Sequence, residues 1–104
     1  MSNPAQSSTQ VRLDKWLWAA RFYKTRSLAR DQIDGGQVHY NGQRSKPGKT
    51  VEVGALVRFW QGQDEREVRV LQVSEQRKAA PLAQLLYEET EESLKKRAQN
   101  SEAR

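Results

Sequence analysis

Two short helical patterns run directly into an Asn-Gly turn between residues 12 and 57, and this order admits few folds. Apolar residues at positions 13, 16, 17 and 20 recur one turn apart and form one face of a helix. A second helix is expected from Thr25, whose hydroxyl can cap it, to the glycine pair at 35–36. Asn41-Gly42 then predicts a type I′ turn between antiparallel strands. Helices followed by a small antiparallel sheet predict an α+β fold.

The second predicted helix has two faces of different character. We expect Leu28, Ala29 and Ile33 to form its buried side. Arg26 and Arg30 lie one turn apart and should share its exposed side. This helix therefore presents positive charge to the solvent.

Two aromatic residues of the first helix are open to two interpretations. Trp18 and Phe22 fall with Lys15 and Arg21 on the side that faces away from the apolar stripe. Their rings could stack on the bases of a nucleic acid, as aromatic side chains do in many RNA-binding proteins. A small core also needs aromatic residues, so packing against the sheet or the C-terminal helix is favoured.

The residues after the Asn-Gly turn alternate in the manner of strands. Strands are expected at Val51 and Val53, at residues 56–59 and at residues 67–73. A second turn is expected at Lys46-Pro47-Gly48, where proline and glycine interrupt the pattern. The sheet should therefore contain several short antiparallel strands.

The C-terminal part of the chain resembles one long helix. Pro81 can occupy the first turn, and an apolar patch follows it at positions 82, 85, 86 and 87. Glutamates and then lysines continue the pattern to Arg97, with Glu91–Lys95 and Glu92–Lys96 spaced for ion pairs. We expect a helix over residues 81–97 that docks by its first turns and projects into solvent.

Positive charge is concentrated in the first part of the chain. The net charge is +5, and residues 1–60 hold ten of the 18 Lys and Arg residues but four of the 13 acidic residues. Guanidinium and ammonium groups bind phosphates, and N–H groups at the start of the second helix can add an anion site. The alternative is that these charges only solvate a small domain. The candidate RNA-binding residues are Arg12, Lys15, Arg21, Lys24, Thr25, Arg26, Arg30, Arg44, Lys46 and Lys49.

Catalytic and metal-binding patterns are missing from the sequence. The chain has no cysteine, and its single histidine, His39, lies in an expected strand. The carboxylates at 88–92 fall in an expected solvated helix, where nothing would shift their pKa values for acid–base work. We therefore predict a protein without enzymatic activity, cofactor or metal.

The chain is expected to form a single domain with two polar ends. Residues 1–10 are rich in Ser, Gln and Asn and predict a disordered leader, and residues 79–104 predict a C-terminal helix with a frayed tail. No signal peptide or long apolar stretch is visible, which favours a soluble cytoplasmic protein without membrane contacts.

Several short motifs occur in the order seen in a known module, the S-four-type RNA-binding domain. They are R-L-D-K at 12–15, T-R-S-L-A at 25–29, I-D-G-G-Q-V at 33–38, N-G at 41–42, K-P-G at 46–48 and V-G-A-L-V at 53–57. The resemblance covers about residues 11–73. VRLDKWLWAARFYKTRSLAR, VHYNGQRSKP and LLYEET further resemble the bacterial ribosome-associated heat shock protein 15 family.

The resemblance implies both a fold and a setting. It implies an αL motif, two short helices packed on a small antiparallel sheet with the Asn-Gly hairpin, followed by a C-terminal helix. It implies binding to ribosomal RNA and tRNA on the free large ribosomal subunit that carries peptidyl-tRNA, which would aid recycling of stalled subunits after heat shock. The motifs carry over the candidate residues except Arg21 and Lys49, which rest on charge. Non-specific binding to single-stranded or duplex nucleic acid and a monomeric state are also expected.

Three other functions remain open from the sequence. The chain could be the RNA-targeting domain of a longer RNA-modifying enzyme, or a protein–protein adaptor that uses the acidic helix at 81–97. A DNA-binding helix-turn-helix is less favoured, because the second helix runs directly into a hairpin at Gly35-Gly36.

Overall fold

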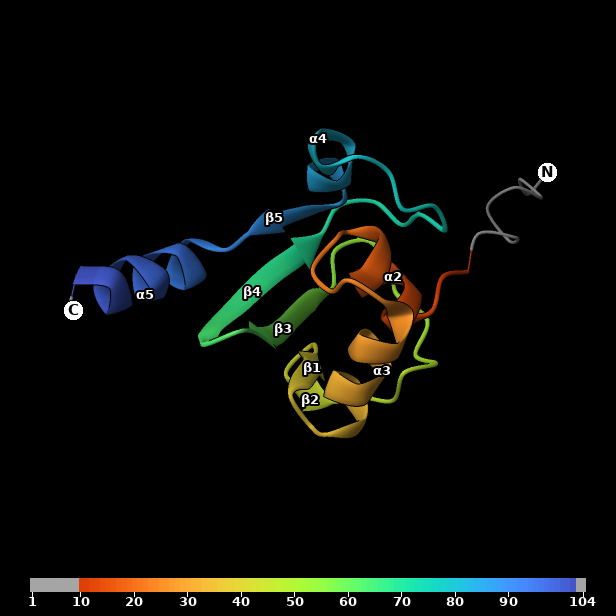
Figure 1. The fold of residues 1–104 in the computed structure, drawn as a ribbon, viewed down its shortest axis with the longest axis horizontal. Coiled ribbons are helices and arrows are strands. Elements are labelled where there is room, and N and C mark those ends of the chain that lie inside the picture. The colour runs from red at the N-terminus through yellow and green to blue at the C-terminus, as the bar shows by residue number, and fades with distance from the viewer. Residues whose placement is uncertain (1–9, 103–104) are drawn as a thin grey trace.

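A computed structural model describes residues 10–102 of the chain. The helices α2 (Leu13–Ala19) and α3 (Arg26–Asp34) come first, and a five-stranded sheet follows, as the predicted α+β class requires (Figure 1). Except for Gln10, the predicted leader lies outside the described residues.

The two N-terminal helices begin and end close to the predicted positions. The Thr25 hydroxyl accepts a hydrogen bond from the Leu28 N–H at 3.0 Å, which confirms the predicted cap of α3. Helix α2 ends at Ala19, and Arg21 has a left-handed backbone with φ 67°. The prediction that Arg21 and Phe22 lie on this helix was therefore wrong.

The sheet has the strand order β2-β1-β3-β4-β5, and every neighbouring pair is antiparallel. Its strands are β1 (Val38–Tyr40), β2 (Gln43–Arg44), β3 (Leu56–Gln61), β4 (Asp64–Val70) and β5 (Tyr87–Glu89). Asn41 and Gly42 have φ values of 53° and 83°, as the predicted type I′ turn between β1 and β2 requires. Val51 and Val53 belong to no strand, and Val53 is 64% exposed beside a turn at Gly54, so the prediction of a strand there was wrong. Strand β4 also ends at Val70, before the predicted end at residue 73.

The core lies between the helices and one face of the sheet. Trp16 is fully buried, and its indole N–H donates to the carbonyl of Gln72 at 2.9 Å. The ring of Phe22 lies 4.5 Å from the ring of Phe59, which confirms that Phe22 fills the core. Trp18 is half-buried and packs against this core. Leu28 is 45% exposed, so its predicted place on the buried side of α3 was wrong.

The C-terminal segment differs from the single helix expected over residues 81–97. It forms α4 (Ala80–Ala83), a short 3₁₀ helix (Gln84–Leu86), β5 and then α5 (Glu91–Glu102). Strand β5 pairs with β4, and this pairing satisfies the backbone groups along the β4 edge. Helix α5 extends from the far end of β5 as an arm (Figure 1). Within residues 10–102, no helix is long and apolar enough to cross a membrane.

Candidate nucleic-acid interface

A groove with a volume of about 830 Å³ separates α3 from the loop that follows β2. Its acidic side chain is Asp34, against five basic ones at Arg12, Arg30, Arg44, Lys46 and Lys49. A polyanion in this groove would meet an excess of positive charge.

A second hollow of about 340 Å³ continues the first along α3. It is lined by Arg26, Ser27 and Asp14, and it shares Arg12 and Arg30 with the larger groove. The two hollows therefore form one surface, which we call the basic groove. Its basic members are Arg12, Arg26, Arg30, Arg44, Lys46 and Lys49.

Asp14 holds two arginines in the smaller hollow. Its carboxylate accepts two hydrogen bonds from the Arg12 guanidinium, at 3.2 and 3.1 Å, and lies 3.6 Å from the Arg26 guanidinium. The hydrogen bond to Asp14 and its negative charge raise the pKa of Arg12 above its usual value. This role of Asp14 was not predicted from the sequence. The available signal was an aspartate two residues after an arginine at the start of a helix.

Arg44, another residue of the basic groove, is held by a hydrogen bond to the backbone of α3. Its guanidinium donates to the carbonyl of Asp34 at 2.9 Å and packs over Gly36. Gly36 has φ +80°, and a Cβ atom there would lie 3.2 Å from the Arg44 guanidinium carbon. Glycine at this position therefore permits the left-handed backbone conformation and leaves room for the Arg44 guanidinium.

Lys49 lies near the ring of Tyr40, with its ammonium nitrogen 5.2 Å from the ring centre. The Tyr40 hydroxyl oxygen in turn accepts the N–H of Glu52 at 3.0 Å. An ordered tyrosine thus supports a lysine that the motif resemblance did not select.

Four of the ten candidate residues lie outside the basic groove. Lys15 pairs with Glu75 at 3.3 Å, and Arg21 donates to the carbonyl of Lys78 at 3.1 Å. Both therefore contact the segment after β4. Lys24 is exposed and lines neither hollow, and the hydroxyl of Thr25 is used by the α3 cap. The structure brings together the other six.

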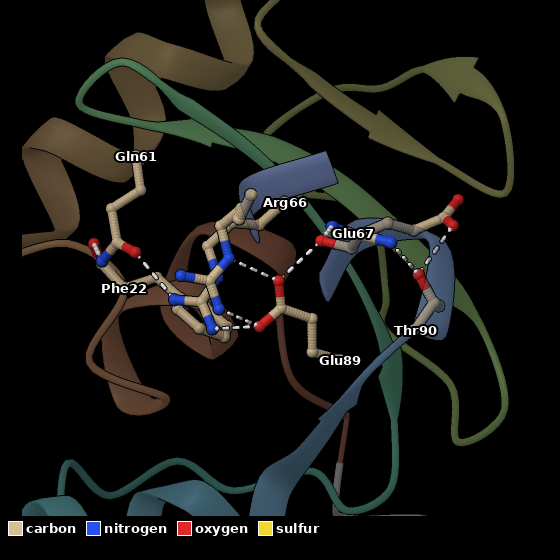
Figure 2. A network of polar contacts seen from close by, with 8 residues as sticks. Phe22, Gln61, Arg66, Glu67, Glu89 and Thr90 are labelled. Atoms are coloured by element: carbon tan, nitrogen blue, oxygen red, sulfur yellow. Dashed lines mark hydrogen bonds and ion pairs between the residues drawn. The ribbon is translucent and has the colours of Figure 1, made fainter. Parts of the chain in front are cut away.

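A second cluster of charged residues joins β4 to β5 and α5. Figure 2 shows Arg66 and Glu89 pointing toward one another, and their ion pair measures 2.9 Å. The Arg97 guanidinium donates to both Glu89 oxygens at 2.7 and 2.9 Å, and the Ser93 hydroxyl donates at 2.6 Å. Burial opposes ionisation, but the hydrogen bonds from Arg97, Ser93 and Arg66 outweigh it and lower the pKa of Glu89 to about 2.

This cluster is structural in character, since its charges pair with one another. The Glu89 side chain is 8% exposed, so the prediction of a solvated carboxylate at this position was wrong. Among residues 10–102, no group of three or more His, Cys, Asp or Glu side chains could hold a metal ion.

Comparison with known proteins gives the following matches. The S4 domain family matches residues 11–57. A heat shock protein 15 homolog from Aeromonas salmonicida is 88% identical over 104 residues, which are 100% of this chain and 79% of that protein. The trimeric structure of heat shock protein 15 from Vibrio cholerae is 59% identical with a TM-score of 0.90, over 91% of this chain and 96% of that chain. An RQC P-site tRNA stabilizing factor from Bacillus subtilis is 40% identical over 53 residues, which are 49% of this chain and 62% of that protein.

Proposed function

Because the chain belongs to the heat shock protein 15 family and carries an S4 domain, we propose that it binds the large ribosomal subunit that carries peptidyl-tRNA. The basic groove is the observation that carries this proposal, since it gathers six basic side chains from the N-cap of α2, from α3, and from β2 with the loop after it. The S4 domain and the heat shock protein 15 relatives support the general part, RNA binding. The name of the Bacillus subtilis relative supports the more specific part, a role beside P-site tRNA.

The proposed action is binding without catalysis. The guanidinium group of an arginine can donate two hydrogen bonds to one phosphate group. The ammonium group of a lysine adds a point charge, which tolerates small shifts of the RNA backbone. A rigid groove of this kind would hold an RNA strand in one register and help to reposition the tRNA, so that a stalled subunit can be recycled after heat shock. This action needs no cofactor, and we propose that it takes place in the cytoplasm, where ribosomes are found.

The state of assembly belongs to this proposal as well. The sequence favours a monomer, whereas the Vibrio cholerae relative is trimeric in its solved structure. We expect the free chain to sediment as a monomer, because the charged network on α5 is satisfied within one chain. A trimer by sedimentation velocity at micromolar concentration would contradict this expectation.

Co-sedimentation tests the proposed function. The purified protein is mixed with small subunits, large subunits, intact ribosomes and large subunits that carry peptidyl-tRNA, at two salt concentrations. Selective pelleting with the last particle at both concentrations is expected. Equal and salt-labile pelleting with every particle would leave a general RNA-binding protein, and the ribosomal role would have to be withdrawn.

A further inference from the structure

We propose that Asp14 is a positioning residue, which fixes the guanidinium groups of Arg12 and Arg26 in the geometry that receives RNA phosphates. This inference rests on the RNA binding proposed above and assigns a role within it. It gives a function to an acidic side chain whose negative charge should otherwise repel the phosphates of RNA.

The exposure of the three side chains is the first argument. The Asp14 side chain is 4% exposed, whereas those of Arg12 and Arg26 are 52% and 45% exposed. The carboxylate is thus withdrawn from solvent while the arginines that it holds remain open to a ligand. A buried carboxylate is costly unless hydrogen bonds and opposite charge compensate it, and these two arginines supply both.

Two hydrogen bonds to one loop hold the backbone around Asp14, so the carboxylate has a fixed place. The N–H groups of Leu13 and Asp14 donate to the carbonyls of Lys49 and Pro47, at 2.8 and 3.2 Å. The start of α2 is therefore tied to the loop that carries Lys46 and Lys49. Asp14 thus connects the arginines of the smaller hollow to the lysines of the larger one.

Two effects of this carboxylate on RNA affinity have opposite signs. Its negative charge weakens the attraction between the groove and a phosphate. Its hydrogen bonds to Arg12 and its ion pair with Arg26 restrict both side chains, which reduces the conformational entropy that they lose when RNA binds. If positioning dominates, removing the charge will weaken binding although it makes the groove more positive.

The test compares Asp14→Asn with Asp34→Asn. Both substitutions remove one negative charge from the groove, but the Asp34 side chain is 58% exposed and lies 3.9 Å from Arg30 in a loose ion pair. The probe is purified large ribosomal subunits that carry peptidyl-tRNA. We expect Asp14→Asn to weaken binding about tenfold, whereas Asp34→Asn should strengthen it about twofold, because it removes a charge that repels phosphate. Equal or tighter binding by Asp14→Asn would overturn the inference.

A second comparison separates positioning from damage to the fold. In a chain that already carries Arg12→Ala and Arg26→Ala, Asp14→Asn should weaken binding less than about twofold, because the residues through which it acts are missing. A further tenfold loss in that background would show a general structural effect and overturn the inference. If the parent chain binds and Asp14→Asn binds equally well, only the positioning role is overturned. Failure of the parent chain to bind any RNA particle would overturn the proposed function and, with it, this inference.

Discussion

Arg30 occupies a central place in the basic groove, since it lines both hollows. Its side chain is 65% exposed, so the fold does not depend on it. Arg30→Glu replaces a phosphate ligand by a repelling charge, and we expect it to weaken RNA binding at least about tenfold with unchanged thermal unfolding. Lys95→Glu on the α5 arm is the matched control, because it makes the same charge change away from the groove. Equal losses for both variants would mean that only net charge matters.

Gly36 combines a backbone requirement with a packing requirement. Gly36→Ala should destabilise the chain by about 1–2 kcal/mol, because a side chain at φ +80° is strained. It should also weaken RNA binding, because the added Cβ displaces the Arg44 guanidinium. Gly62→Ala makes the same change at φ +64° with no atom within 4 Å. The two variants should therefore lose similar stability in chemical denaturation, whereas only Gly36→Ala should lose affinity in an RNA titration.

At this scale the sequence predicted residue types better than side-chain contacts. Arg26, Arg30, Arg44 and Lys46 were selected by motif, and they do lie along one groove. Asp14 could not be assigned in the same way, since its partners depend on how α2 and α3 cross. The helical period of Leu28 was correct, but period alone does not say how wide the buried stripe of a helix is.

At the scale of elements, β5 shows where local pattern and tertiary pairing disagree. Leucines and glutamates at residues 82–92 favour a helix by propensity. The edge of β4 offers unpaired backbone groups, and residues 87–89 satisfy them. Because that pairing is between segments distant in sequence, no local window could reveal it. Helix α3 and the Asn-Gly hairpin depend on neighbouring residues, and the sequence predicted both correctly.

The β4–β5 junction should depend on the charge of Glu89. Glu89→Gln leaves Arg66, whose side chain is 15% exposed, without its carboxylate partner. We expect a loss of about 2 kcal/mol in the free energy of unfolding at neutral pH, measured by chemical denaturation. Glu88→Gln, on the exposed side of the same strand, should change stability little. A negligible effect of Glu89→Gln would mean that the network contributes no stability.

The same junction predicts a pH dependence. Folding lowers the pKa of Glu89 from 4.5 to about 2, so the unfolded chain binds this proton more tightly than the folded chain. The stabilisation is therefore complete above about pH 4.5 and is lost as the pH falls toward about 2. In acid titrations followed by circular dichroism, the stability difference between the parent chain and Glu89→Gln should shrink across this window. A constant difference would show that Glu89 is not the titrating group.

At the scale of the whole molecule, the sequence predicted that positive charge is concentrated in one half of the chain. The structure gathers the charged residues into two separate regions. The basic groove is built from the start of α2, from α3, and from β2 with the loop after it, while Glu89 and its partners join β4, β5 and α5. An RNA strand can therefore contact one end of the molecule without displacing the charges that hold the other. The uneven charge of the chain thus corresponds to a division between the basic groove, which we propose as the RNA-binding surface, and a structural network.

This division makes the salt dependence of RNA binding a measure of the groove alone. If about 4–6 phosphates are neutralised, the slope of log affinity against log salt should be about −3 to −5, with the lower coefficient for single strands. Removing one groove cation, as in Arg30→Ala, should make the slope less steep by about 0.7–0.9. Lys95→Ala should leave it unchanged, because α5 lies outside the contact. Fluorescence anisotropy with labelled tRNA over a salt series measures all three slopes. A flat response, or equal changes in both variants, would contradict a phosphate-binding groove at this position.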